Sequence, residues 1–286
     1  MPSCNVVATL PSGPVSGSQL VADLRALGLR AGAVTMAHTR MSALGWVVGG
    51  SETVVRALLE ALGPDGTLMA FAGWEDNPFH LAAWPPAWRE AYEAAMPPFD
   101  GAVSEAKRAH GRLPERIRTW PGARRSADPE ANIVALGARA AWIVAEQPPD
   151  DPWGTRSPLA RLVETDGQVL LLGAPLGTIT LLHHAEAIAD APRKRLVTYR
   201  MPLRAADGGV RWRETTTIDT SRGAFPYARI VGPDRDAFAV IGQAALAEGI
   251  GTSGRVGQAV AHLFPARDLV HFATQWMQSH FGAPRN

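Results

Sequence analysis

The segment of residues 167–190, GQVLLLGAPLGTITLLHHAEAIAD, constrains the fold more than any other part of the chain. It opens with an apolar run from Val169 to Leu172, which Gly173 and Pro175 close. A short, continuous apolar run is typical of a strand buried on both faces. Thr178 or Thr180 can then cap a helix. We therefore expect a buried strand, a loop and a helix, and α/β enzymes usually place their chemistry where such a strand ends.

The helix expected after this loop carries His183, His184 and Glu186. His183 and Glu186 are three residues apart, so they share one helix face. A carboxylate can hold an imidazole in one tautomer, which is what a general base needs. The same spacing also fits a structural or capping histidine. A metal site is not expected, because adjacent histidines on a helix point about 100° apart.

Helical and strand patterns alternate along the chain, which is the grammar of a layered α/β fold. We expect an αβα-type domain with a central mixed sheet. Residues 1–17 are expected to be a flexible N-terminal segment and residues 18–286 a single domain. The expected helices are 18–29, 52–62, 158–164, 237–247 and 269–281, with Ser18 and Ser51 as caps of the first two, and the expected strands are 33–37, 67–71, 131–135, 169–172, 196–201 and 210–218. Asp207-Gly208-Gly209 predicts a hairpin turn between the last two.

Residues 74–110 interrupt this alternation with a long insertion rich in tryptophan, proline and acidic residues. A loop of this length inside a compact domain usually has a function or is disordered, and its tryptophans argue against disorder. Acids among aromatic rings are typical of a pocket for a polycation. A solvated, proline-rich excursion with aromatic anchors is the alternative. The acids of this segment are Glu75, Asp76, Glu90, Glu93, Asp100 and Glu105.

Charge and motifs exclude several classes of protein. The formal net charge of +1 gives no indication of a nucleic-acid or membrane surface. The single cysteine, Cys4, excludes an intrachain disulfide framework and a cysteine-rich zinc site. Neither a signal peptide nor an apolar run approaching about 18 residues is present, so we expect a soluble, cytoplasmic protein. Dinucleotide-binding, phosphate-loop and Gly-x-Ser-x-Gly motifs are also absent.

Seven sequence blocks, taken together, resemble the aminoglycoside N3-acetyltransferase family, the antibiotic N-acetyltransferase type that is unrelated to the GNAT acetyltransferases. The resemblance runs from about residue 18 to residue 283. In order, the blocks are AH at 37–38 with SALGWVVGG at 42–50, ALGPDGTL at 61–68, MPPFD at 96–100, PGARRSA at 121–127, SPLARL at 157–162, LLGA at 171–174 with TLLHHAE at 180–186, and GRVG at 254–257 with ARDLV at 266–270.

The resemblance implies acetyl-CoA-dependent acetylation of the 3-amino group of the deoxystreptamine ring of aminoglycosides, conferring antibiotic resistance. His183 is the expected general base and Glu186 its orienting partner, with direct attack on acetyl-CoA and no metal. The enzyme is expected to be a monomer or homodimer. The residues expected on the CoA side are His38, Thr39, Arg40, Ser42, Ser126 and Ser157. The acids expected to hold the cationic aminoglycoside are Glu75, Asp76, Asp100, Glu105 and Asp219.

Two departures from the family pattern bear on the substrate. Arg40 stands where the family usually has a small residue, so it either binds a CoA phosphate or narrows the channel. Asp128 replaces a family histidine with an anion. Three alternatives therefore stay open: a CoA-dependent acetyltransferase for another amine in a biosynthetic pathway, a non-catalytic binder of CoA or amino sugars, and, more remotely, a metal-dependent hydrolase.

Overall fold

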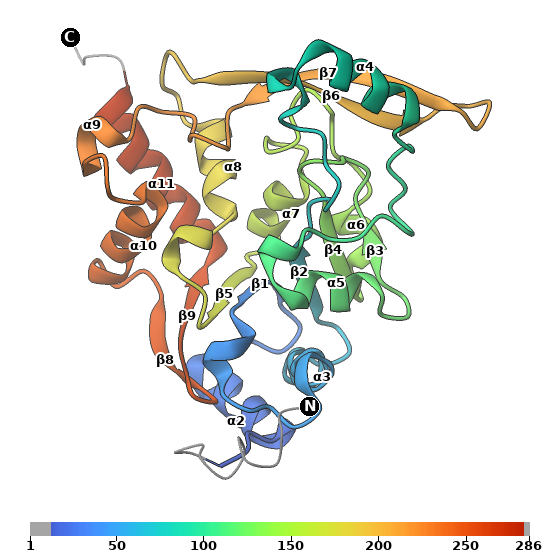
Figure 1. Ribbon diagram of the computed structural model, residues 1–286. Helices are drawn as coiled ribbons and strands as arrows, with labels where there is room; N and C mark the ends of the chain where they lie inside the picture. Colours follow the sequence, from blue (N-terminus) through green and yellow to red (C-terminus); the bar gives the residue numbers. More distant parts are fainter. Residues whose placement is uncertain (1–12, 283–286) are drawn as a thin grey trace.

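The central feature of the computed structural model, which describes residues 13–282, is a mixed sheet of seven strands in the order β3-β4-β2-β1-β5-β9-β8 (Figure 1). Strand β1 runs parallel to its neighbours β2 and β5, whereas β4 and β9 are antiparallel to the strands beside them. The predicted α/β fold with a mixed sheet is thus confirmed. The strands are β1 (Val34–Thr39), β2 (Thr67–Phe71), β3 (Arg124–Arg125), β4 (Ile133–Gly137), β5 (Gln168–Leu172), β8 (Thr252–Val256) and β9 (Ala259–Pro265).

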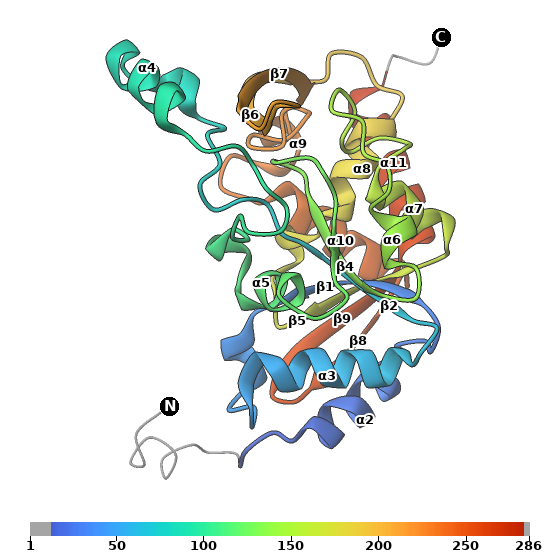
Figure 2. The same ribbon diagram turned by 90° about the vertical axis from the view of Figure 1, so that its right-hand side faces the viewer.

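Helices cover both faces of this sheet, as the turned view shows (Figure 2). One face carries α2, α3 and α5, and the other carries α6, α7, α8, α10 and α11. Strand β5 is buried throughout, with Val169 and Leu171 in one core and Leu170 and Leu172 in the other. The helices are α2 (Gly17–Leu27), α3 (Gly50–Leu62), α4 (Pro86–Ala95), α5 (Arg112–Arg118), α6 (Ala140–Ile143), α7 (Pro158–Glu164), α8 (Leu181–Ile188), α9 (Ala228–Val231), α10 (Ala237–Ala247) and α11 (Ala266–Phe281).

The expected helix caps were wrong in detail. Ser16, rather than Ser18, caps α2 by accepting a hydrogen bond from the backbone N–H of Gln19. Helix α3 begins at Gly50 and has Gly49 at its N-cap with a φ of 79°, so it has no side-chain cap. Thr180 occupies the N-cap position of α8, but its hydroxyl makes no capping hydrogen bond. Ser16 lies in extended backbone, from which a hydroxyl reaches the first turn, whereas Thr180 is already helical.

A separate hairpin of β6 (Leu196–Arg204) and β7 (Val210–Ile218) lies beyond the main sheet (Figure 1). The predicted turn is confirmed, because Asp207 Oδ1 accepts a hydrogen bond from the N–H of Gly209. Segment 74–110 packs against this hairpin and is not one long loop, since Pro86–Ala95 forms α4. Its aromatic residues divide, with Trp74 and Phe99 in a small buried cluster and Trp88 exposed.

Two structural findings concern the ends and the surface of the molecule. Most of the N-terminal segment expected to be flexible, including Cys4, lies outside the described residues. Within residues 13–282, none of the helices combines the length and apolar character needed to cross a membrane.

Candidate active site

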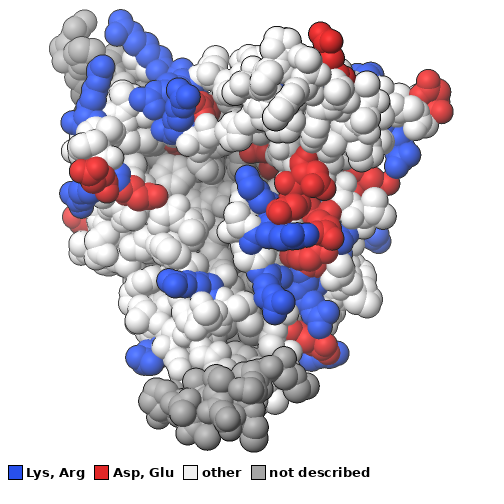
Figure 3. Space-filling model, in the orientation of Figure 1, with Lys and Arg blue, Asp and Glu red and all other residues white. Residues whose placement is uncertain are grey.

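A cavity of about 530 Å³ opens where β1 and β5 end on the face of the sheet that carries α8. One part of its wall is the loop from His38 to Ser42, and another is residues 174–180, which lead into α8. These loops are adjacent because β1 pairs with β5, and the backbone N–H of Arg40 donates to the carbonyl of Leu172. Figure 3 shows the hollowed face, with acidic side chains gathered on one side. The cavity lies at the edge of the sheet where parallel strands present a binding crevice.

His183 reaches this cavity from the first turn of α8, and its ring is bound to Glu186. His183 Nδ1 lies 2.7 Å from Glu186 Oε2, and the side chain of Glu186 is fully enclosed. A carboxylate at this distance accepts a hydrogen bond, so the proton of a neutral imidazole is held on Nδ1. Nε2 of His183 then carries a free lone pair, which is the form that a general base needs.

The second oxygen of Glu186 is held by two further donors. Glu186 Oε1 accepts hydrogen bonds from the hydroxyl of Tyr227, at 2.9 Å, and from the backbone N–H of Ala224, at 2.8 Å. Burial, with the nearby charge of Glu186, raises the pKa of Tyr227, so its hydroxyl keeps its proton and donates. A buried carboxylate needs such donors, because an unpaired buried charge is very costly. The orientation of His183 therefore depends on residues about 40 positions along the chain.

Aromatic rings enclose His183 on two sides. Its ring centroid lies 5.1 Å from that of Trp153 and 4.8 Å from that of Phe238. Trp153 also packs against Phe71, and the ring centroid of Phe71 lies 4.5 Å from that of His110. These rings exclude water from the reacting centre, which strengthens electrostatic interactions within it.

A second cavity, of about 340 Å³, lies on the other side of His183. Gly177, His183 and Phe238 line both cavities. The wall of this second cavity also includes residues 220–223, Arg235, Asp236 and the start of α10. His183 is thus accessible from two hollows, an arrangement that suits an enzyme with two substrates.

The residues predicted on the CoA side fall into two groups. His38, Thr39, Arg40 and Ser42 all line the large cavity. The structure does not bring Ser126 and Ser157 to it. Ser126 is buried, and its hydroxyl accepts the N–H of Ile133, while Ser157 is buried and caps α7 through the N–H of Ala160. Both hydroxyl groups therefore accept hydrogen bonds from the backbone instead of facing the large cavity.

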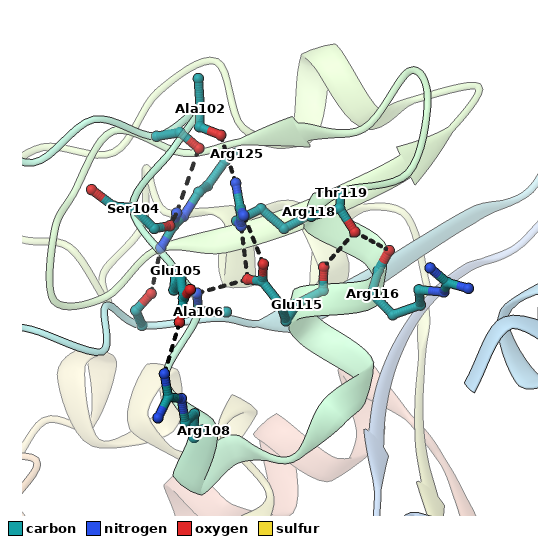
Figure 4. A network of polar contacts seen from close by, with 12 residues as sticks. Ala102, Ser104, Glu105, Ala106, Arg108, Glu115, Arg116, Arg118, Thr119 and Arg125 are labelled. Carbon is teal, nitrogen blue, oxygen red and sulfur yellow. Dashed lines mark hydrogen bonds and ion pairs between the residues drawn. The ribbon is translucent and has the colours of Figure 1, made fainter. Parts of the chain in front are cut away.

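The predicted aminoglycoside-binding acids are outside the large cavity, and most are already paired. Glu75 and Glu105 both lie near Arg108, at 3.8 and 3.2 Å. Figure 4 shows the pair of Glu105 and Arg108 within a polar network. Asp100 lies 2.9 Å from Arg204. Asp219 accepts hydrogen bonds from its own turn, at residues 221–222, beside the second cavity. Asp76 lies in the same segment, and its backbone carbonyl accepts the hydroxyl of Tyr92. A role for these acids in binding stays a prediction.

Sequence reasoning missed a partly buried acid, Glu130, just before β4. Burial, which outweighs the hydrogen bond donated by Asn77 and the nearby charge of Lys107, raises the pKa of Glu130 to about 7. Asp128 beside it accepts the N–H groups of Glu130 and Ala131 and lies 3.3 Å from Arg213. The family departure at Asp128 pointed to this place, but nothing in the pattern of Asp-Pro-Glu indicated that the acids would be enclosed.

Comparison with known proteins places this geometry in a family. Residues 36–278 match the family model described as aminoglycoside 3-N-acetyltransferase. The chain is 54% identical to aminoglycoside N(3)-acetyltransferase VIII of Streptomyces fradiae and 50% identical to aminoglycoside N(3)-acetyltransferase VII of Streptomyces paromomycinus. The first alignment covers 94% of each chain, and the second covers 96% of this chain and 95% of its relative.

Solved structures share the fold closely. Aminoglycoside acetyltransferase AAC(3)-Xa superposes with a TM-score of 0.91 at 50% identity, covering 94% of each chain. AAC-IIIb, in a binary complex with CoASH, gives 0.87 at 41% identity, covering 96% of this chain and all of its own. AAC-VIa, bound to sisomicin, gives 0.86 at 39% identity, covering 94% of this chain and all of its own.

Proposed function

The chain belongs to the aminoglycoside 3-N-acetyltransferase family, and on that premise we propose that it transfers the acetyl group of acetyl-CoA directly to the 3-amino group of a deoxystreptamine ring. It is an enzyme of antibiotic resistance, as its relatives at 40–54% identity are aminoglycoside N(3)-acetyltransferases. The finer proposal concerns the donor, the base and the course of the reaction.

His183 acts as the general base in this proposal. An amine is largely protonated at neutral pH and must lose a proton before its lone pair can attack a thioester. The free Nε2 of His183 accepts that proton, while Glu186 holds Nδ1–H and stabilises the imidazolium that forms. The neutral amine attacks the thioester carbonyl, and the N–C bond forms before the C–S bond breaks and the thiolate of CoA leaves. The proton on His183 passes to that sulfur, and the nitrogen releases its second proton to solvent as the neutral amide forms.

The observation that carries the proposal is the bond between His183 and the enclosed Glu186 at the boundary of two cavities. The large cavity suits the donor, because its wall holds Arg40 and Arg112, whose guanidinium groups match phosphates. The CoASH complex of AAC-IIIb supports a donor site in this fold, and the sisomicin complex of AAC-VIa supports an acceptor site.

Thiol release from acetyl-CoA, measured with a panel that includes gentamicin and kanamycin, tests the function. We expect turnover that requires the aminoglycoside and a product acetylated at the 3-amino group. His183→Ala should lower kcat by about 10²–10⁴-fold, the usual contribution of acid–base catalysis. His271→Ala, at an exposed histidine on α11, is the matched control.

Four results would contradict parts of the proposal. Turnover with other amines alone would favour a biosynthetic acetyltransferase. Binding of CoASH without turnover on any amine would favour a non-catalytic binder. A folded His183→Ala variant with near-wild-type turnover would remove His183 from the mechanism, and inhibition by chelators would favour a metal-dependent hydrolase.

A further inference from the structure

His38 lies on the same face of the sheet as His183. It is on β1, two residues beyond Met36, so its side chain points to the side that carries α8. It pairs with Leu171 on β5, and the loop that leads to His183 begins two residues after that partner. Both imidazoles line the large cavity. The fold thus places His38 and His183, together with His110, around one reaction space.

The two ring nitrogens of His38 have different surroundings. Nε2 is enclosed and has no hydrogen-bond partner in the described part of the chain, whereas Nδ1 is not enclosed in this way. Within residues 13–282, Nε2 is unpartnered in either tautomer, but an enclosed N–H without an acceptor is rarer than an enclosed lone pair without a donor. A proton on Nδ1 can be donated into the cavity. The surroundings favour the tautomer with its proton on Nδ1.

His38 is also held neutral. Burial, with a smaller contribution from the charge of His110, lowers the pKa of His38 to about 4. Burial likewise lowers the pKa of His110, whose Nδ1 is bound to the carbonyl of Ala72. With such a pKa, His38 is a poor base at neutral pH. It remains a neutral hydrogen-bond donor while His183 takes up a proton.

We propose that Nδ1–H of His38 donates a hydrogen bond to the carbonyl oxygen of the thioester and stabilises the oxyanion that forms when the amine attacks. This inference rests on the proposed function and adds a second catalytic residue to it. As the N–C bond forms, the carbonyl π electrons move to oxygen. They return when the C–S bond breaks and thiolate leaves. His38 keeps its proton throughout. Of the two protons that the nitrogen loses, one passes through His183 to the sulfur and the other goes to solvent.

A donor fixed in place before the reaction is effective because it needs no reorganisation when charge develops. The position of His38 meets this requirement, since its backbone pairs with Leu171 of β5, and the preceding residues of β1 also pair with β2. Simple packing of His38 against the CoA arm is the competing role. The two roles differ in one respect, because CoASH lacks the acetyl carbonyl and cannot use the proposed hydrogen bond.

Asparagine and glutamine substitutions distinguish a role of Nδ1 of His38 from a role of Nε2, because each amide replaces the N–H of one ring nitrogen. The amide N–H₂ of asparagine lies near the position of Nδ1, and that of glutamine lies near the position of Nε2. We expect His38→Gln and His38→Ala to lower kcat by about 10²–10³-fold, the usual cost of removing an oxyanion donor. His38→Asn should keep kcat within about tenfold of wild type. The Kd for CoASH, from calorimetric titration, should stay within about threefold in all three variants.

Several results would overturn the proposal. They are near-wild-type kcat in a folded His38→Ala variant, rescue by glutamine instead of asparagine, and a weakened Kd for CoASH with kcat unchanged. Thermal unfolding of each variant shows whether it is folded. Nitrogen NMR of histidine-labelled wild type at pH 7 tests the tautomer without any substitution, and a proton on Nε2 of His38 would also overturn it. Absence of turnover by the wild type would contradict the proposed function, while the NMR result would still test His38.

Discussion

Beside the large cavity the carboxylate of Glu186 is bound by neutral donors, whereas most acids of segment 75–118 are paired with arginines. Glu186 is fully enclosed, and Tyr227 and Ala224 hold its second oxygen. In segment 75–118, Glu105 pairs with Arg108 at a site where both side chains are more than half exposed (Figure 4). A glutamate thus has fixed hydrogen-bond partners beside the large cavity, whereas in segment 75–118 it has a partner that a ligand could replace.

The difference follows from desolvation. A buried carboxylate without donors costs several kcal/mol, so its partners cannot be exchanged cheaply. An exposed ion pair contributes about 0–1 kcal/mol, so an ammonium group of a ligand could replace an arginine at little cost. Glu130 lies between these cases, since it is partly buried and, in the described part of the chain, its carboxyl group has only the amide of Asn77 as a hydrogen-bond donor. Three substitutions test how far the comparison holds.

Glu130→Gln should have the largest effect. The pKa of Glu130 is 4.5 ordinarily and about 7 in the folded protein, so folding favours the protonated acid. Its contribution to stability is full below pH 4.5 and is lost as the pH rises through 7. Glutamine stays neutral, so the variant should match wild type at about pH 4.5 and be more stable at about pH 8 by up to about 3 kcal/mol.

Urea unfolding at both pH values measures this difference. Glu105→Gln, which changes an exposed and paired acid, is the control and should show almost none of it. The charges that act on Glu130 are those of Lys107, Asp128 and His183. A stability difference that is the same at both pH values would show that folding does not raise the pKa of Glu130.

Arg40→Ser should have an intermediate effect. Arg40 is exposed at the large cavity and has no acidic partner within residues 13–282, so its charge is available to a phosphate. Loss of that contact should weaken CoA binding about tenfold, or about 1.4 kcal/mol. Calorimetric titration of CoA, without aminoglycoside, measures it, with Arg25→Ser on the opposite face of the sheet as control. Tighter binding by Arg40→Ser would mean that Arg40 obstructs the channel.

Asp100→Asn should have the smallest effect. The carboxylate already pairs with Arg204 and accepts the N–H of Ala102, so an aminoglycoside must compete for it. We expect the KM for the aminoglycoside to rise by no more than about fivefold, with the KM for acetyl-CoA unchanged. Steady-state kinetics with each substrate varied in turn decides the matter. A tenfold rise in the KM for the aminoglycoside would mean that Asp100, like Glu186, has a partner that cannot be exchanged cheaply. Equal rises in both KM values would indicate a role in folding.

Local patterns predicted the parts of the site that lie within one stretch of chain. The apolar run at Val169 gave a strand buried on both faces, and the spacing of His183 and Glu186 gave their shared helix face. The hairpin was predicted in the same way, because its turn residues are adjacent. In each case the forces that fix the structure act between near neighbours.

Contacts between distant residues could not be predicted. Tyr227 is 41 residues from Glu186, and neither its burial nor its hydrogen bond leaves a periodic signal. For Ser126 and Ser157 a contact was predicted that the structure does not show. Their place in family blocks suggested a ligand, whereas each hydroxyl accepts a hydrogen bond from a backbone N–H. A serine hydroxyl can bond to the backbone or to a ligand, and only the folded structure shows which of the two it does.

Gly177 lies in the wall shared by the two cavities, where there is no room for a side chain. A Cβ at this position would lie 2.7 Å from Asp236 Oδ2, closer than such atoms approach. Asp236 in turn caps α10 by accepting the N–H of Ala239, at 2.9 Å. A side chain at position 177 would therefore thicken the partition between the hollows and displace a helix cap at the same time. Relatives that keep Asp236 in this place should have little freedom to vary the glycine.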